Sequence, residues 1–330
     1  MSDFVRRIVS LPASAAPALM VVIDTEEEFD WSGPFGRTGH AVEALADLGR
    51  AQDLFEGFGI VPVYAVDYPV ADNPRKAASL RHWIEGGRAV LAAQLHGWVT
   101  PPFDEPLNRR NSYQANLPPA LERAKLESLL ARVAETFGTR PLIHKAGRYG
   151  IGPATPGIIA ALGFEIDLSI CPRFDGRRDG GPDHTRFSAD PFRFGPGEAL
   201  LELPSTADYC GLLSALGNPL HGLVASPPLE RARLKAAFSR LGLLERIRLS
   251  PEGHSLADLK RLTRSLLAGG TKVLTFSFHS PSLRPGCTPY VKTAADLARL
   301  METCRGYFEF FRDEVGGRFS MPFGIRDELA

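Results

Sequence analysis

The sequence has no excess of charge of either sign. Its 330 residues include 38 lysines and arginines and 38 aspartates and glutamates. A chain with this balance has no long-range field that would draw it to nucleic acid or to an anionic membrane surface. We therefore expect a carbohydrate or another small molecule as the binding partner, and no nucleic acid.

Cysteine is scarce and widely spaced. The four cysteines form no Cys-x-x-Cys pair, and they stand at positions 171, 210, 287 and 304. This spacing disfavours a disulfide framework and a structural zinc cluster. We interpret all four as reduced thiols.

Long apolar runs are absent as well. No stretch approaches the ~18 apolar residues that a membrane-spanning helix needs. The chain begins with Arg6 and Arg7 and a short apolar run that Pro12 interrupts. A signal peptide needs a longer unbroken run, so we interpret residues 1–18 as a lead-in to the first strand and expect a cytoplasmic protein without a membrane span.

Two enzyme signatures are also missing. The chain has no Gly-x-Ser-x-Gly nucleophile elbow, and the glycine-rich segment 147–153 lacks the spacing of a dinucleotide-binding loop. We find no internal repeat, and no shift in composition marks a linker. We therefore expect a single catalytic domain over residues 1–330.

What the sequence does contain is a regular alternation of two patterns. Apolar runs of strand length alternate with segments of helical period. The strand candidates are residues 18–24, 61–67, 88–95, 141–147, 165–170, 199–206, 272–279 and 318–323. The helix candidates are residues 41–59, 74–85, 117–138, 155–164, 228–242, 255–270 and 293–316. This order, with roughly seven or eight strands, predicts an α/β fold, either a barrel or a large open parallel sheet.

Charged and imidazole side chains stand near the carboxyl ends of these strands. They are Asp24, Glu26, His96, Lys145, Asp167 and His279. In a parallel sheet these ends lie at the same edge. Unpaired charges in such places are costly, so we expect the residues to pair with one another or to bind something.

The surroundings of these residues refine the expectation. Glu27 and Glu28 complete the acidic stretch, and we expect them to face solvent or to pair within their loop. His96 leads into a segment with Trp98 and several prolines, which suits a sugar ring. His279 has an ordinary pKa near ~6.5, which suits proton transfer. The segment 109–113 forms either a clamp for a phosphate or carboxylate or a solvated lid.

Five motifs carry a specific resemblance. In chain order they are VIDTEEEFDW, QLHGWVTPPFDE, HKAGRYG, FEIDLSICP and FSFHSPSL. In this order and spacing they resemble the polysaccharide deacetylase (NodB-homology, carbohydrate esterase family 4) superfamily over about residues 20–322, and most closely its WalW-type branch. The resemblance implies a distorted, TIM-barrel-like (β/α) barrel of roughly seven strands. It also implies metal-assisted hydrolysis of an N-acetyl, less often an O-acetyl, group.

The resemblance further implies catalytic roles. Asp24 matches the general base and His279 the general acid. Lys145 stands where an arginine usually orients the base, and Asp167 matches the acid of the fourth motif. We expect Lys145 to keep Asp24 ionised, and Asp167 to pair with Lys145 or Arg148.

The implied metal site departs from the family pattern. Glu26 and His96 match ligands of a divalent metal, for which zinc is the expected ion. The position of the second histidine holds Thr100, whose hydroxyl is a poor ligand for such an ion. Three alternatives stay open: Glu26 and His96 form an unusual site with the base, a further acid such as Glu28 or Asp104 completes it, or no metal binds.

Aromatic and cationic side chains near the same strand ends are the candidates for substrate binding. They are Trp98, Tyr113, Arg148 and Tyr149. Three functions remain open: a deacetylase acting on an amino sugar or polysaccharide precursor, a carbohydrate-binding protein that has lost hydrolysis, and an amide hydrolase with a non-sugar substrate. An open groove would favour a polysaccharide, whereas a closed pocket would favour a small amide.

Overall fold

The computed structural model describes residues 5–31, 33–38, 40–224 and 241–329. Most of the helix predicted at 228–242 lies outside these residues. The other predicted helices are present as α1 (Leu48–Gly57), α3 (Ala78–Glu85), α4 (Pro119–Phe137), α5 (Thr155–Ala161), α9 (Leu256–Ala268) and α10 (Ala294–Glu309). The short helices α2 (Tyr68–Ala71), α6 (Gly217–Val224) and α11 (Pro322–Glu328) add to them. The last predicted strand is shorter than expected, because α11 begins at Pro322.

In the described part of the chain, a parallel sheet of seven strands forms the centre of the fold. Its order is β11 (Val273–His279), β2 (Ala18–Thr25), β3 (Val63–Val66), β4 (Val90–Leu95), β5 (Ile143–Ala146), β6 (Ile166–Asp167) and β8 (Leu200–Glu202). Next to β8 the sheet continues antiparallel with β7 (Phe192–Phe194) and β1 (Arg7–Ile8), and β12 (Arg318–Phe319) pairs with β2. The segment expected as a lead-in thus carries a strand of the sheet.

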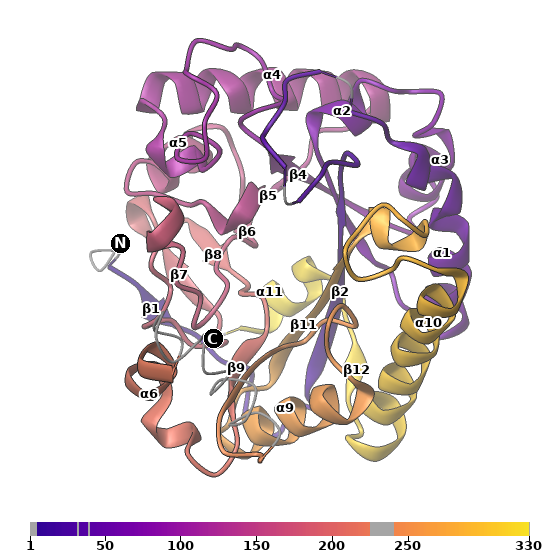
Figure 1. Ribbon diagram of the computed structural model, residues 1–330, viewed down its shortest axis with the longest axis vertical. Helices are drawn as coiled ribbons and strands as arrows, with labels where there is room; N and C mark the ends of the chain where they lie inside the picture. Colours follow the sequence, from indigo (N-terminus) through magenta and orange to yellow (C-terminus); the bar gives the residue numbers. More distant parts are fainter. Residues whose placement is uncertain (1–4, 32, 39, 225–240, 330) are drawn as a thin grey trace.

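The sheet curves into a distorted barrel whose strand ladder is open between β8 and β11, where single hydrogen bonds connect the two sides. The regular ladder of β8 ends before Pro204, which has no backbone N–H to donate. Thr275 of β11 instead donates its N–H to Thr206 Oγ1 (2.8 Å) and its hydroxyl to the Pro204 carbonyl (2.8 Å). The Ser277 N–H donates to the Leu249 carbonyl (3.1 Å). Figure 1 shows the strands around a common centre with α1, α3, α4, α5 and α10 outside them. The predicted α/β barrel of about seven strands is confirmed.

The alternation of side chains along the strands creates two apolar cores. Ala18, Met20 and Val22 of β2 belong to the core inside the barrel, whereas Leu19, Val21 and Ile23 pack in the core beneath the helices. Helix α11 places the fully buried Ile325 in the inner core. Because alternation continues to the carboxyl ends of the strands, it decides which polar side chains point into the barrel mouth.

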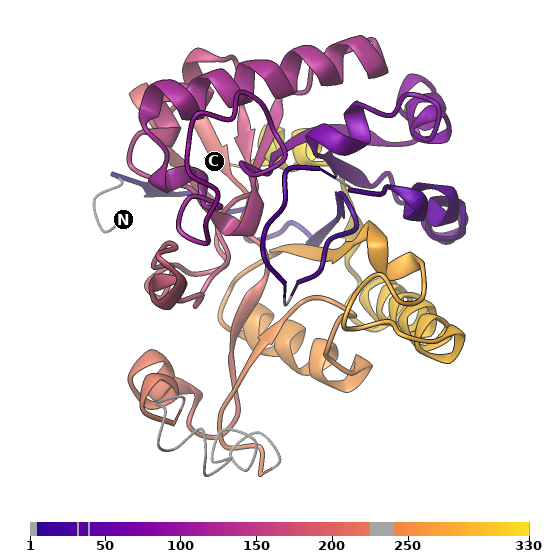
Figure 2. The ribbon, with the colours of Figure 1, turned by 45° about the horizontal axis from the view of Figure 1, so that its top comes forward.

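An excursion of the chain leaves the barrel after β8. It contains the antiparallel pair β9 (Ala207–Cys210) and β10 (Glu245–Arg248), and α6. Figure 2 shows this arm projecting away from the helices that surround the barrel. The chain returns to the barrel through Leu249 and then enters α9, whose first turn is capped by Ser255 and Asp258.

No helix among the described residues is long and apolar enough to cross a bilayer.

Candidate active site

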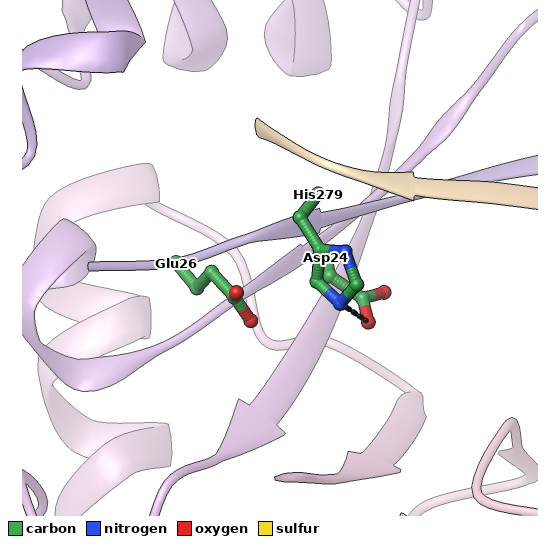
Figure 3. A group of neighbouring side chains, drawn as sticks. All are labelled: Asp24, Glu26 and His279. Carbon is green, nitrogen blue, oxygen red and sulfur yellow. Dashed lines mark ion pairs between the residues drawn. The ribbon is translucent and has the colours of Figure 1, made fainter. Parts of the chain in front are cut away.

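Asp24 occupies the centre of the barrel mouth, at the carboxyl end of β2. It follows Ala18, Met20 and Val22 on the inner face, so its side chain points inward. Its Oδ1 accepts a hydrogen bond from Lys145 Nζ at 2.5 Å, and its Oδ2 lies 3.7 Å from His279 Nε2. Figure 3 shows the His279 ring facing the Asp24 carboxylate, with Glu26 beside them. The structure thus brings together the expected base, its expected cationic partner and the expected acid.

His279 is held from behind by Glu252, which the sequence analysis did not identify. The His279 Nδ1 atom lies 2.8 Å from Glu252 Oε2, and the His279 N–H donates to Glu252 Oε1 at 3.1 Å. Burial favours the neutral imidazole, but the charges of Glu252 and Glu26 outweigh it and raise the pKa of His279 to about 9. His279 therefore carries a proton at neutral pH.

Arg248 and Ser282 complete the surroundings of Glu252. The Ser282 hydroxyl donates to Glu252 Oε1 at 2.5 Å, and Arg248 Nη2 lies 3.5 Å from Glu252 Oε2. Burial would raise the pKa of Glu252, but the charges of His279 and Arg248 and the hydrogen bonds lower it below its ordinary value. Arg248 also donates to the Tyr149 hydroxyl at 2.9 Å and lines the cavity.

Glu26 and His96 lie side by side, as predicted for two metal ligands. His96 Nε2 is 3.5 Å from Glu26 Oε2. The Glu26 carboxylate also receives a long hydrogen bond from Gln94 Nε2 (3.4 Å). Burial raises the pKa of Glu26 well above its ordinary value.

Glu27 does not face solvent, and this expectation was wrong. The residue is fully buried, its Oε2 lies 2.8 Å from His96 Nδ1, and its Oε1 accepts from Trp98 Nε1 at 2.8 Å. The alternation of β2 continues past the strand, so Glu27 points to the outer side, where the loop after β4 covers it. Burial raises its pKa to about 7. Glu28, by contrast, accepts from the Ala44 N–H (2.6 Å) within its own loop.

Asp67 joins this buried group at the end of β3. Its Oδ2 accepts the Glu27 N–H at 2.8 Å and lies 3.7 Å from His96 Nδ1, and its Oδ1 caps α2 through the Val70 N–H. Possible ligand atoms of Glu27, Asp67 and His96 lie within 4.8 Å of one another, as do those of Asp24, Glu26 and His279. Asp67 is the last residue of the strand predicted at 61–67, so the sequence did carry a signal for it.

The donor set beside Glu26 fits a divalent cation. Because His96 Nδ1 is engaged by Glu27, its Nε2 is the nitrogen that faces Glu26. Gln94 Oε1, which belongs to a residue lining the same cavity, is buried without a hydrogen-bond partner among the described residues. Imidazole nitrogen and carboxylate oxygen are ligands that zinc and similar ions accept.

The positions considered for completing the site do not reach it. Thr100 is fully buried, and its carbonyl accepts from Lys125 Nζ at 2.7 Å. Asp104 is exposed in the loop after β4. Glu28, the other acid considered, accepts a hydrogen bond from the Ala44 N–H. None of these three residues lines the cavity around Asp24.

Asp167 lies on the other side of the sheet. Its Oδ1 is 2.7 Å from His144 Nδ1 and accepts from the Ser169 hydroxyl at 2.5 Å, with all three side chains fully buried. The expected pairing with Lys145 or Arg148 is therefore wrong. Ile166 and its neighbour Leu168 belong to the inner core, so alternation turns Asp167 outward.

The predicted substrate-binding residues Trp98, Tyr113, Arg148 and Tyr149 all line one cavity of about 500 Å³ above Asp24. Its other walls include aromatic side chains, namely Phe29, Trp31, Phe35 and Phe174. Arg148 and Tyr149 have left-handed φ angles of 55° and 60°, a costly conformation for residues with a Cβ. That backbone turns both side chains into the cavity directly after β5.

Comparison with solved structures identifies the fold. A protein classed as a polysaccharide deacetylase from Mycobacterium smegmatis is similar with a TM-score of 0.51 and 18% identity, over 91% of this chain and 87% of the other. PuuE allantoinase is similar with a TM-score of 0.51 and 17% identity, over 96% and 91%. A GH57 branching enzyme from Thermococcus kodakaraensis has a TM-score of 0.50 and 10% identity, over 94% and 71%. No family model matches the chain, and no curated protein matches it in sequence.

These similarities show that the chain has the fold of the polysaccharide deacetylases, so the resemblance read from the five motifs is confirmed at the level of fold. The WalW-type branch stays a prediction. Three proteins with three different names share the fold, and therefore the site residues must decide the chemistry.

Proposed function

We propose that this protein is a metal-assisted hydrolase of carbon–nitrogen amide bonds that removes an N-acetyl group from an amino sugar or a related small amide. The observation that carries the proposal is the position of Asp24 between Lys145 Nζ (2.5 Å) and His279 Nε2 (3.7 Å), with the Glu26–His96 pair next to it. A base, an acid and a cation site in one cavity are the parts that amide hydrolysis needs.

Each side chain has a defined role. Asp24 removes a proton from the attacking water, and Lys145 keeps the Asp24 carboxylate ionised. His279, which Glu252 keeps protonated, donates a proton to the leaving amine. When bound by Glu26 and His96, a divalent cation, for which we propose zinc, lowers the pKa of a water molecule and polarises the acyl carbonyl.

A second candidate function is carbohydrate binding without hydrolysis. It is favoured by Thr100, which stands in place of a second histidine and contributes no side-chain atom to the cavity. The fold similarities fit both candidates, because the same fold carries different activities.

The experiment that separates them measures bound metal and acetate release together. We expect about one zinc per wild-type chain, and acetate release from N-acetylglucosamine that falls ~10²-fold or more in Asp24→Asn and His279→Ala. Asp104→Asn makes the same chemical change at an exposed acid of the same face and should retain wild-type rates. Full metal with no acetate release would favour the binding protein. Unchanged rates in Asp24→Asn would refute the assignment of the base.

A further inference from the structure

We propose, on the basis of the function proposed above, that the cavity accepts a single small N-acyl compound of about one sugar ring, and that it excludes the internal units of a polysaccharide. A polymer that lies across a site needs a groove open at both ends. Two sets of contacts around the barrel mouth remove such a groove.

The first set is a wall over the end of β5, where the loops after β4 and β6 meet. Asp179 accepts from Arg148 (3.1 Å) and from Arg109 (3.2 Å), and Asn116 Nδ2 donates to the Gly180 carbonyl (2.7 Å). Exposed ion pairs alone would be weak and easily opened. The stability of the wall therefore depends on the side-chain packing beneath these ion pairs.

That packing centres on Tyr113. Its ring is 1% exposed, and the guanidinium of Arg148 covers one face at 4.0 Å from the ring centre. On the loop after β6, a Cβ added to Gly181 would lie 2.5 Å from the ring. The two loops are therefore in close contact at Tyr113, and the side of the mouth above β5 is a packed interface.

The second set is a roof formed by the segment after β2. At one end of the segment, the Trp31 ring lies edge-on to His279 (4.7 Å) and to Tyr290 (5.7 Å). At the other end, the Phe35 ring is 4.9 Å from that of Trp98 and 5.2 Å from the Arg148 guanidinium. Figure 2 shows this indigo segment hanging across the barrel mouth.

The roof also contacts the loop after β4 outside the cavity. Arg37 donates to the Glu105 carbonyl, and its guanidinium lies 5.0 Å from the centre of the Phe103 ring. The segment thus runs from the β11 side of the mouth to the loop after β4, and Phe29, Trp31 and Phe35 line the cavity from above.

The volume of the cavity and the side chains that line it match one ring. A cavity of about 500 Å³ lies in the range of pockets that bury a small molecule. The partly exposed rings of Trp31 and Phe35 line the cavity, and a sugar or heterocycle can pack against them. The acyl group of such a ligand can reach Asp24 at the floor, whereas the flanking units of a polymer would collide with the wall at Tyr113.

The test compares N-acetylglucosamine with its β-1,4-linked pentamer, using wild-type protein supplied with Zn²⁺. Acetate release gives kcat/KM for each compound, and tandem mass spectrometry locates the deacetylated unit in the pentamer. Phe35→Ala removes the contact of the roof with Trp98. Leu107→Ala is the matched control, because Leu107 is exposed in the loop after β4 and does not line the cavity.

We expect kcat/KM for the monomer to exceed that for any internal unit by at least about 100-fold, because internal units cannot reach the attack geometry. Phe35→Ala should lower the ratio of kcat/KM for the monomer to kcat/KM for an internal unit, and Leu107→Ala should leave this ratio unchanged. Deacetylation of a terminal unit alone would support the inference that the cavity accepts one ring. It would also show that this ring can be the end of a chain. Internal units deacetylated as fast as the monomer would overturn the inference while the proposed function stands. No acetate from either compound would refute the proposed function, and the inference with it.

Discussion

At the scale of single residues, the surroundings of a side chain decide its chemistry in this site. Two carboxylates, Glu252 and Glu27, each contact one histidine at its Nδ1 atom, but the pKa values of the two histidines are shifted in opposite directions. Glu252 raises the pKa of His279, whereas His96 is so deeply buried that its pKa is lowered to about 4. His279 thus holds its proton and His96 stays neutral, which suits their proposed roles as the acid and as a metal ligand.

Replacing Glu252 should change the pH dependence of the reaction. His279 is an acid only while protonated, so the wild-type kcat should fall as pH rises through about 9. Glu252→Gln removes the nearest negative charge, and the alkaline limb should move to lower pH while activity at acidic pH is largely kept. The measurement is kcat against pH for both proteins. Superimposable profiles would show that His279 does not depend on Glu252.

The same pKa shift has a consequence for folding. The folded-state pKa of His279 lies above its ordinary value of 6.5. Its protonation therefore contributes stability that is fully present below pH ~6.5 and is lost as pH rises through about 9.

Glu27 should control metal affinity through the orientation of His96. A glutamine at this position has one acceptor oxygen for two donors, so either His96 or Trp98 loses its hydrogen bond. We expect Glu27→Gln to weaken zinc binding by ~10–100-fold, as losing the partner of a ligand histidine does. Competition titration with a chromogenic chelator measures this. Glu28→Gln is the control, because Glu28 bonds to the Ala44 N–H, and equal affinities in both variants would contradict the role of Glu27.

At the scale of strands and loops, the alternation of side chains explains what the sequence could and could not reveal. Apolar runs predicted the strands, and the positions of Asp24, Lys145 and His279 at their ends placed these residues in one site. The same rule, applied to Asp167 between Ile166 and Leu168, would have turned it away from the site. Motif order alone cannot tell the two faces of a strand apart.

Other site residues could not be predicted, for a different reason. Arg248 and Glu252 come from the arm between β8 and α9, whose strands are antiparallel and outside the barrel ladder. No rule of the parallel sheet brings such residues to the mouth. Arg248 and Glu252 lie at the mouth because Leu249 and Thr206 form hydrogen bonds with β11, and these contacts join segments about 30 to 70 residues apart in the sequence.

Asp167 should matter for stability more than for catalysis. Asp167→Asn weakens a buried hydrogen-bonded pair with His144, and we expect the free energy of unfolding to fall by ~1–3 kcal/mol. The kcat of the folded protein should stay within a few-fold of wild type. Urea denaturation and acetate release measure the two effects. A large loss of kcat without a loss of stability would restore a catalytic role for Asp167.

At the scale of the whole molecule, the polar candidate site and the apolar packing of α11 lie at opposite ends of the barrel. The carboxyl ends of the strands carry buried charges and left-handed backbone, whereas the other end is closed by apolar contacts of α11 and of residues near the amino terminus. Costly features at the mouth can persist because the rest of the barrel holds them in place.

Ile325 tests this division. It is fully buried in the inner core, so Ile325→Ala should lower the free energy of unfolding by ~2–5 kcal/mol. The KM of the folded enzyme should not change, because the residue lies far along the barrel from the cavity lining. Met321→Ala, at a 42% exposed position nearby, should change stability by less than about 0.5 kcal/mol. A changed KM in Ile325→Ala would show that the two ends are coupled.

The arm that leaves the barrel after β8 contributes side chains to the candidate site. It returns with Glu252, the carboxylate that raises the pKa of His279. In the proposed mechanism the strength of the acid therefore depends on this arm, whereas the base belongs to the barrel itself. Under the proposed function, exchanging this one excursion of the chain would adapt the acid to another leaving group, while the seven parallel strands and the proposed metal site stay as they are.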